Sequence, residues 1–317
     1  MPTLEMVVEQ TQPLTSRIRR LRLARADGTP VPTYTAGAHI ELHVPTPTPQ
    51  TPLHRAYSLV APADGGHHYE IAVQLEPEGS GGSRWVHQLQ VGQRVTVTPP
   101  RNQFELDAQA TRCLLLAGGI GITPILCMAR ALQQHGRPFE FHYAARDRAG
   151  AAYCDEVEAL GGRCWFDGGD PRQGMPLGSL TAQPAPGQHL YVCGPKPFIA
   201  AALEQARAQG WPEAQLHNEL FSGALPTAGE QAFRVELRLS GQTLEVPAGQ
   251  SVMDAMEAAG LDPMFDCRRG ECGVCVTQVL QGEAEHRDIC LSERERAAGR
   301  FCTCVSRARS GLLVLEL

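Results

Sequence analysis

The chain has 317 residues, a formal net charge of −6 and 43% hydrophobic residues, which are ordinary values for a globular protein with two or three domains. No segment contains the roughly 18 consecutive apolar residues that a membrane-spanning helix needs, and residues 1–20 lack the layout of a signal peptide. The mild charge forms no basic stripe of the kind that follows a phosphate backbone. We therefore predict a cytoplasmic protein that binds neither a membrane nor nucleic acid. We also expect a monomer, although composition and charge do not determine the oligomeric state.

Residues 1–106 are predicted to form an antiparallel β-barrel. Short alternating runs, such as His39–Val44 and Arg94–Val97, are separated by proline and glycine, which is typical of antiparallel strands. Four prolines between positions 45 and 52 predict a surface loop. A glycine-rich stretch at residues 79–83 opens a short helical run.

Residues 107–224 are predicted to form a parallel α/β domain, because apolar strands alternate with helical segments. The first strand is expected at residues 113–117, and a glycine turn leads from it into a helix at residues 124–134. Further strands are expected at residues 139–144 and 189–193.

Residues 225–232 are predicted to be a linker, since glycine, alanine, proline and threonine dominate this part of the chain. The last domain, residues 233–317, opens with two alternating runs on either side of a Ser-Gly turn, which indicates a hairpin. A helix over residues 252–259 follows, and we expect it to end at Gly260.

Most of the cysteines gather in the last domain. The chain has 11 cysteines, and six of them lie within the 38 positions from Cys267 to Cys304. Cys267, Cys272 and Cys275 make a C-x4-C-x2-C run, which is the plant-type spacing of ligands to a [2Fe-2S] cluster. Gly270 lies within the run, where it allows a loop to wrap the cluster closely.

Spacing alone leaves alternatives open for these cysteines. One alternative is a zinc site with four thiolates, from Cys272, Cys275, Cys302 and Cys304. That site would leave Cys267 unused. Another is a tight loop of unliganded cysteines. Spacing also does not choose between Cys302 and Cys304 as the fourth iron ligand, because we expect both on one face of a strand.

A glycine turn after the first strand of the α/β domain predicts a site for a pyrophosphate. The strand runs into Gly118-Gly119-Ile120-Gly121, and Pro124 lies in the first turn of the helix. Backbone N–H groups at such a helix start can bind phosphate. The turn does not match the G-x-G-x-x-G fingerprint, so a requirement of packing alone would also explain it.

A second strand ends at Cys193-Gly194-Pro195, at what we expect to be the same carboxyl edge of the sheet. Ligands of open α/β folds bind at that edge. The two strand ends together favour a dinucleotide site. Considered alone, Cys193 is better explained as a buried structural cysteine.

The barrel carries a signal for a phosphorylated planar cofactor. Arg55, Tyr57 and Ser58 combine a cation for a phosphate, an aromatic ring that can stack and a hydroxyl group. The glycine-rich stretch that ends at Ser83 provides a helix start suited to the phosphate. By itself, the Arg-x-Tyr-Ser pattern is also compatible with an ordinary strand that carries a surface arginine.

Taken in order, these motifs resemble the phthalate dioxygenase reductase family, flavin reductases of the ferredoxin-NADP reductase superfamily with a C-terminal ferredoxin domain. The resemblance covers essentially the whole chain, and it extends to Glu219, Phe221 and the segment from Cys304 to Arg307. It implies an antiparallel β-barrel flavin domain, a parallel α/β nucleotide-binding domain and a C-terminal β-grasp ferredoxin domain.

The resemblance also implies three cofactor sites. It assigns FMN to Arg55, Ala56, Tyr57, Ser58, Val73, Gln74, Leu75, Gly81, Gly82, Ser83, Arg84, Thr123 and Phe221. It assigns a nicotinamide dinucleotide to Gly118, Gly119, Gly121, Thr123, Pro124, Arg146, Cys193, Gly194 and Pro195. It selects Cys304 as the fourth ligand of the [2Fe-2S] cluster, beside Cys267, Cys272 and Cys275.

Four of these positions are expected to act in catalysis. Cys193 would help to place the nicotinamide, and Ser58 or Thr123 would hydrogen-bond the flavin at the edge where hydride arrives. Glu219 is expected to assist them.

The implied function is that of a reductase for an oxygenase. Hydride from NADH brings two electrons at once, whereas the cluster accepts one, so FMN must stand between them. The electrons would then pass to a separate Rieske-type oxygenase that acts on an aromatic or similar small substrate. NADPH remains an alternative, because Arg146 and Arg148 follow a strand near which a 2′-phosphate would lie.

Two functions of other classes compete with this one. The first is a non-catalytic ferredoxin-like electron carrier fused to a degenerate flavin domain. The second is a zinc-stabilised sensor that binds a nucleotide without turnover. The intact set of Arg55, Tyr57, Ser58 and Thr123 favours the reductase over both.

Overall fold

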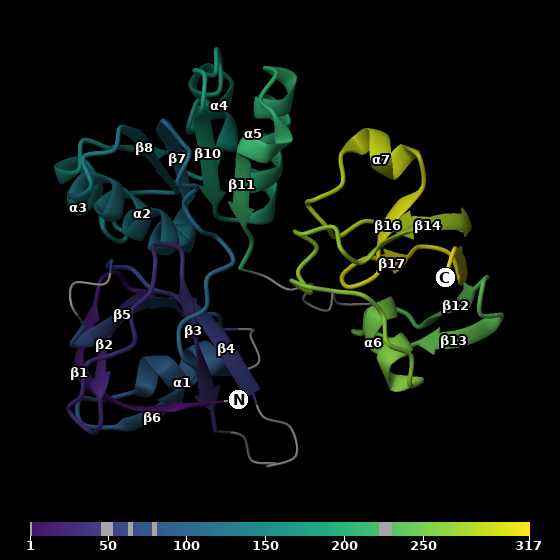
Figure 1. Cartoon of the computed structure of the whole chain (residues 1–317), viewed down its shortest axis with the longest axis horizontal. Helices are drawn as coiled ribbons and strands as arrows, with labels where there is room; N and C mark the ends of the chain where they lie inside the picture. The colour runs from purple at the N-terminus through teal and green to yellow at the C-terminus, as the bar shows by residue number, and fades with distance from the viewer. Residues whose placement is uncertain (1, 46–52, 63–65, 78–80, 222–229) are drawn as a thin grey trace. The chain divides into compact units, whose positions relative to one another are not determined.

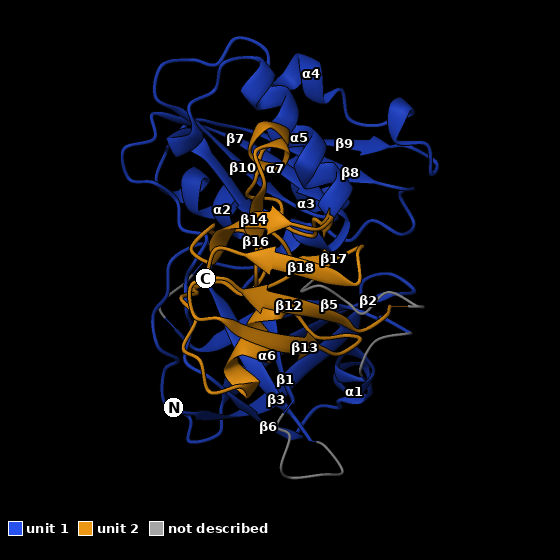
Figure 2. Ribbon diagram, turned by 90° about the vertical axis from the view of Figure 1, so that its right-hand side faces the viewer, with its two compact units in different colours: residues 1–219 blue, residues 220–317 orange. Residues whose placement is uncertain are grey.

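The computed structural model describes residues 2–45, 53–62, 66–77, 81–221 and 230–317. The chain divides into two compact units, residues 1–219 and residues 220–317 (Figures 1 and 2). Most of the expected proline-rich loop, the start of the glycine-rich stretch and most of the expected linker lie outside the described residues. Within the described ranges, no helix is long and apolar enough to cross a bilayer.

The first part of unit 1 is a six-stranded antiparallel sheet in the order β4-β3-β6-β1-β2-β5. A bridge between Leu59 and Ile71 joins the chain after β4 to the outer strand β5, so the sheet forms a nearly closed barrel, as predicted. The elements of this part are β1 (Leu4–Pro13), β2 (Ile18–Arg25), β3 (His39–Val44), β4 (Leu53–Ser58), β5 (His68–Gln74), α1 (Gly82–Gln88) and β6 (Arg94–Val97).

The second part of unit 1 is a five-stranded parallel sheet in the order β11-β10-β7-β8-β9. The strand order reverses at β7, which has β8 on one side and β10 on the other. In open α/β sheets, ligands bind at such a switch point. The elements are β7 (Arg112–Gly118), η1 (Gly119–Gly121), α2 (Ile122–Gln134), β8 (Phe139–Ala145), α3 (Cys154–Ala159), β9 (Arg163–Phe166), η2 (Pro171–Gln173), α4 (Leu177–Leu180), β10 (Gln188–Cys193), α5 (Lys196–Ala208), η3 (Glu213–Gln215) and β11 (Leu216–Glu219).

The two parts of unit 1 share one hydrophobic core. Ile18 and Val60 from the barrel side belong to the same buried cluster as Leu115 of β7 and Ile125 of α2. Arg130 of α2 donates a hydrogen bond of 3.0 Å to the carbonyl of Val60. This shared core fixes the barrel edge against the carboxyl ends of the parallel strands.

Unit 2 is a β-grasp domain with a mixed sheet in the order β13-β12-β18-β14-β16, in which β12 and β18 are parallel. Ser251 begins the helix α6, since its hydroxyl accepts from the backbone N–H of Asp254 in a reciprocal capping box. The elements are β12 (Phe233–Leu237), β13 (Gln242–Val246), α6 (Val252–Ala258), β14 (Val276–Gln281), β15 (Ala284–Glu285), α7 (Glu293–Ala297), β16 (Arg300–Cys302), β17 (Arg307–Ala308) and β18 (Leu312–Leu315).

A buried arginine connects the start of unit 2 with the region around the cysteines. The Arg307 side chain is 4% exposed and pairs with Glu230 at 3.5 Å. Its guanidinium also donates to the carbonyls of Gln231, at 2.9 Å, and of Pro247 and Gln250. Arg307 thus binds three backbone carbonyls and the carboxylate of Glu230, whose side chain is also buried.

Replacing Arg307 with alanine should lower the free energy of unfolding of unit 2 by about 3 kcal/mol, because a buried ion pair loses one partner and three carbonyls lose their donor. Denaturant titration, followed by loss of the visible absorption of the holoprotein, measures the change. Arg309→Ala is the matched control, since Arg309 is exposed two positions away. Equal midpoints for the two variants would contradict this role of Arg307.

Candidate functional site

The carboxyl ends of β7 and β10 approach each other so closely that only glycine fits between them. A Cβ atom on Gly121 would lie 2.4 Å from the carbonyl carbon and oxygen of Cys193. One on Gly194 would lie 2.9 Å from the Cα of Gly118. The predicted strand ends therefore lie together, with Gly121 beside the backbone of Cys193.

The glycine turn continues into a well-formed helix. The φ of Gly119 is +54°, a left-handed conformation that glycine adopts without strain. The Thr123 hydroxyl donates to the carbonyl of Ile120 at 3.1 Å, and Pro124 is buried in the first turn of α2. The helix start thus has the form of a phosphate-binding turn.

One edge of the barrel meets this region. The Ser58 hydroxyl, at the end of β4, lies 3.5 Å from a carboxylate oxygen of Glu219, at the end of β11. Both residues are buried, with 5% and 2% exposed. In addition, β5 lies beside η1. Three of the four expected catalytic residues, Ser58, Glu219 and Thr123, are therefore buried polar groups at this junction or at the helix start beside it.

Arg55 and the start of α1 form a second group in the barrel. A Cβ atom on Gly82 would lie 2.8 Å from the Cγ of Arg55, and Gly81 has φ +95°. These two glycines allow the chain to pass directly over the arginine side chain. The Ser83 hydroxyl accepts from the backbone N–H of Glu76 at 3.0 Å, and this bond connects the helix start to the end of β5.

The other barrel positions differ in exposure. Tyr57 is partly buried against the barrel core, and this burial raises the pKa of its hydroxyl to about 12. The Val73 side chain is buried in the same core, so mainly its backbone can face a ligand. Gln74 and Leu75 are partly buried, whereas Ala56 and Arg84 are exposed.

The two arginines after β8 have different surroundings. Arg148 pairs with Asp155 and Glu158, each at 2.7 Å. These hydrogen bonds raise the pKa of its guanidinium, the bond to Glu158 contributing most. Arg146 is exposed and its guanidinium lies close to Gly169, since a Cβ atom there would be 3.0 Å from it. Arg148 is therefore already bound to carboxylates.

In unit 2 the first cysteine of the run accepts several backbone hydrogen bonds. The Cys267 sulfur accepts from the N–H groups of Arg269, at 3.3 Å, and of Glu271 and Cys272, each at 3.4 Å. Amide groups directed at a sulfur stabilise a thiolate. This is the arrangement that a loop around an iron–sulfur cluster needs.

The four predicted ligands form two pairs. The backbone N–H of Cys272 donates to the sulfur of Cys267 at 3.4 Å, and the sulfur of Cys275 lies 3.2 Å from that of Cys304. Two pairs of thiols around one loop fit two iron atoms, each with two protein ligands.

Gly270 also explains the shape of the loop. Its φ is +75°, and a Cβ atom would lie 2.7 Å from the side chain of Val305 and 2.8 Å from the Cα of Asp288. Its carbonyl accepts from the N–H groups of Ile289 and Cys290, at 2.9 and 3.2 Å. No motif in the sequence pointed to Asp288, although its segment holds the loop in place.

The expectation that Cys302 and Cys304 share one face of a strand is wrong. The strand β16 ends at Cys302, and Cys304 lies in the turn that follows. Because Val276 pairs with Cys302 across β14 and β16, the turn brings Cys304 to Cys275. The sulfur of Cys302 instead lies 3.3 Å from that of Cys290 and also contacts Cys275.

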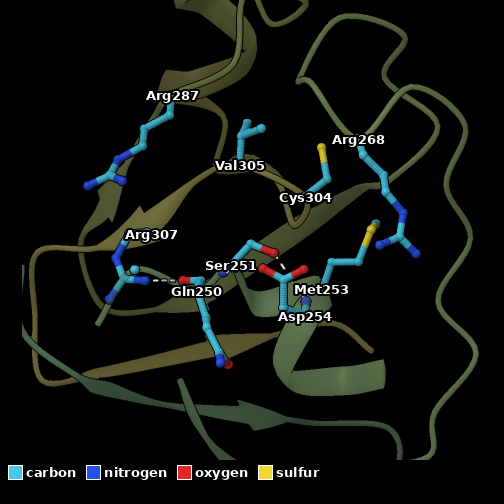
Figure 3. Close-up of a pocket in the computed structure, with 10 residues that line it drawn as sticks. Gln250, Ser251, Met253, Asp254, Arg268, Arg287, Cys304, Val305 and Arg307 are labelled. Atoms are coloured by element: carbon cyan, nitrogen blue, oxygen red, sulfur yellow. Dashed lines mark hydrogen bonds between the residues drawn. The ribbon is translucent and has the colours of Figure 1, made fainter. Parts of the chain in front are cut away.

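A cavity of about 220 Å³ lies beside Cys304, the predicted fourth ligand (Figure 3). Its walls come from the start of α6 and from the chain around Cys304, with Arg268 on one side and Arg287 and Arg307 on another. Cys304 itself is 9% exposed, whereas Cys272 is exposed. Of the four predicted ligands, Cys272 is therefore the one most accessible to solvent.

Three family models match the chain. The model described as an oxidoreductase FAD-binding domain matches residues 5–106, and the 2Fe-2S iron-sulfur cluster binding domain matches residues 235–309. Residues 93–216 match the N-terminal domain of dimethylamine monooxygenase subunit DmmA-like proteins. The match to the 2Fe-2S model removes the zinc alternative, and it agrees with the amide bonds to Cys267.

Relatives resemble the chain over its whole length. A vanillate O-demethylase oxidoreductase of Pseudomonas sp. strain HR199 is 41% identical over 99% of this chain and 100% of its own. The beta subunit of a heme-dependent oxidative N-demethylase from Ectopseudomonas mendocina is 39% identical over 99% of both chains.

The solved structure of phthalate dioxygenase reductase has the same architecture. It is 34% identical, with a TM-score of 0.72, over 99% of this chain and 98% of its own. The barrel, the parallel sheet and the C-terminal cluster domain are therefore shared. The chain belongs to the phthalate dioxygenase reductase family, and it is a flavin-dependent oxidoreductase with a C-terminal [2Fe-2S] domain.

Proposed function

We propose that this chain is the reductase component of a Rieske-type oxygenase, which takes hydride from NADH onto FMN and passes electrons singly through its [2Fe-2S] cluster. The contact between the buried Ser58 and Glu219, beside the helix start that carries Thr123, supports this proposal most directly. A flavin ring that binds between a barrel and a dinucleotide site needs buried polar side chains of this kind around it. Bound flavin supplies the conversion of a two-electron transfer into one-electron steps.

Residues of unit 1 would bind the two organic groups. The FMN phosphate would lie against Arg55 and the helix start at Gly81, Gly82, Ser83 and Arg84. Its ring would lie along Ala56, Tyr57, Ser58, Val73, Gln74, Leu75, Thr123 and Phe221. Phe221 follows the end of β11 by two positions and is the member of this set that belongs to unit 2.

The dinucleotide would bind at the carboxyl ends of β7 and β10. Its pyrophosphate would face the backbone N–H groups of the glycine turn, and the buried Cys193 would position the nicotinamide. The residues assigned to it are Gly118, Gly119, Gly121, Thr123, Pro124, Arg146, Cys193, Gly194 and Pro195.

NADH fits better than NADPH for an electrostatic reason. A 2′-phosphate needs basic groups, and Arg148 is already bound to Asp155 and Glu158. Only Arg146 of the two arginines would then face the adenine ribose. A single exposed arginine provides a weak site for a doubly charged phosphate.

In unit 2, Cys267, Cys272, Cys275 and Cys304 would hold the cluster. The amide bonds to Cys267 and the pairing of Cys275 with Cys304 support this set. We propose functional boundaries at residues 1–106 for the flavin part, 107–224 for the nucleotide part and 233–317 for the cluster part. Residues 225–232 would be the linker.

An oxygenase is the proposed recipient of the electrons. The relatives are named for vanillate O-demethylation and for an oxidative N-demethylase, and the solved neighbour is named as a reductase of phthalate dioxygenase. An aromatic or similar small molecule is the proposed substrate of that partner. We further propose that the reductase is a cytoplasmic monomer.

Replacing Glu219 with alanine should slow the reduction of the flavin by NADH about tenfold, because a buried hydrogen bond at the junction is lost. Glu219→Gln keeps a hydrogen-bonding side chain of the same size, and most of the rate should remain. Stopped-flow absorbance in the flavin band measures both rates under anaerobic conditions. If Glu219→Ala reacts as fast as the unmodified protein, Glu219 has no part in this step.

The proposal is tested by an anaerobic titration of the purified holoprotein with NADH and, separately, with NADPH. We expect NADH to bleach both the flavin and the iron–sulfur absorption, with NADPH at least tenfold less effective. Chromatography of the flavin released by heat should identify FMN rather than FAD. Cluster absorption without any reduction by NADH would favour a non-catalytic electron carrier and overturn the proposal.

A further inference from the structure

Two cysteines outside the proposed ligand set lie close together in unit 2. The sulfur atoms of Cys290 and Cys302 are 3.3 Å apart. Cys302 is fully buried at the end of β16, whereas Cys290 is partly exposed in the segment before α7. A disulfide bond has a sulfur–sulfur distance of about 2.05 Å, so a small rotation of the side chains brings the two atoms into bonding distance.

The backbone around the two thiols is held in place. The N–H of Cys290 donates to the carbonyl of Gly270 at 3.2 Å, and Cys302 pairs with Val276 across β14 and β16. Asp288 is fully buried and accepts from the Ser306 hydroxyl at 3.2 Å and from Arg296 at 3.1 Å. The thiols therefore face each other from two anchored segments.

A metal ion is a less suitable occupant of this place. Asp288, Cys290 and Cys302 each offer a ligand atom, and these atoms lie within 4.8 Å of one another. However, the carboxylate of Asp288 already binds Arg296, Ser306 and the backbone N–H of Leu291. A metal would have to replace these partners, whereas a disulfide leaves all of them unchanged.

We propose that Cys290 and Cys302 form a reversible disulfide when the holoprotein meets a peroxide. The peroxide first oxidises the partly exposed Cys290 thiol to a sulfenic acid and is itself reduced to water or an alcohol. The Cys302 sulfur then attacks the Cys290 sulfur, a sulfur–sulfur bond forms, and water leaves. In total the two thiols lose two electrons and two protons, and one peroxide bond is reduced.

The modification would affect the neighbourhood of the cluster without using its ligands. Cys302 lies two positions before Cys304, and Cys290 lies in the segment that holds Gly270. The new bond would therefore connect the two chain segments that support the ligand loop. The inference goes beyond the proposed function, because it holds whichever partner receives the electrons.

Mass spectrometry of the holoprotein after treatment with about one equivalent of hydrogen peroxide tests this inference. Free thiols are blocked with N-ethylmaleimide under denaturing conditions before digestion. We expect the peptides of Cys290 and Cys302 to be joined, with the loss of two hydrogen atoms, and to separate after reduction with dithiothreitol. The iron–sulfur absorption should remain, which distinguishes this bond from random oxidation after loss of the cluster.

Two variants complete the test. Cys290→Ser should show no joined peptide, and its partly exposed position makes normal folding the expected outcome. Cys302→Ala should instead accumulate a sulfenic acid at Cys290 that reacts with dimedone. The inference is overturned if Cys290 is converted to a sulfinic or sulfonic acid without cross-linking, or if Cys302 joins a peptide only after iron is released.

Discussion

Replacing Cys304 with serine is expected to reduce the iron and acid-labile sulfide of the purified protein to less than about a tenth, because a cluster needs all four of its thiolates. The sulfur of Cys304 lies 3.2 Å from that of Cys275, so this side chain completes the second pair of predicted ligands. Metal analysis, the visible spectrum and the electron paramagnetic resonance signal after reduction measure the loss.

The matched control is Cys302→Ser, only two positions away. Cys302 lies against Cys290 and is not part of the proposed ligand set, so this variant should keep its cluster. The flavin content of both variants should be unchanged, since the proposed flavin residues lie almost entirely in unit 1. The opposite result, loss of the cluster in Cys302→Ser and its retention in Cys304→Ser, would make Cys302 the fourth ligand.

The second large effect is expected for Gly121→Ala, which should lower kcat/KM for NADH about a hundredfold, as a displacement of roughly 1 Å in a binding site can do. The new Cβ would lie 2.4 Å from the carbonyl group of Cys193, so the two strand ends must move apart. The φ of Gly121 is −62°, which any residue adopts, and the effect is therefore one of space alone.

Gly119→Ala is the control for this prediction. A Cβ at Gly119 meets no atom within 4 Å, and its cost comes from the left-handed backbone with φ +54°. That cost is about 1 kcal/mol of stability, without displacement of Cys193. Steady-state assays with ferricyanide as acceptor, together with thermal unfolding, separate the two effects. A Gly121→Ala variant with an unchanged kcat/KM would show that the contact with Cys193 does not shape the dinucleotide site.

Local patterns predicted a large part of the fold and of the cluster site. Three of the four proposed ligands lie within nine positions, from Cys267 to Cys275, and such a spacing has meaning before any folding is known. The alternating runs of the barrel and the apolar strands of the α/β part could also be recognised in the sequence. A strand buried on one face alternates apolar and polar residues, whereas a strand buried on both faces is a continuous apolar run. The family comparisons and the structure confirm this architecture.

Spacing could not choose between Cys302 and Cys304 as the fourth ligand, because both lie at a suitable distance from Cys275 along the chain. The end of β16 at Cys302 and the turn after it decide which thiol meets Cys275. The expectation that both cysteines share one face of a strand was wrong. The length of β16 depends on its pairing with β14, and no local pattern of three residues reveals that pairing. The resemblance to the family, not the spacing, was the basis for naming Cys304.

The sequence by itself therefore determined the types of element, the cysteine run and the glycine turn, since each depends on residues close together in the chain. Only the tertiary structure brought Ser58 to Glu219, which are 161 positions apart, and bound Arg148 to its two carboxylates. It alone placed Cys290 against Cys302 and Arg307 against Glu230. Such contacts depend on how whole strands and helices pack, and that packing is a property of the complete core rather than of any short segment.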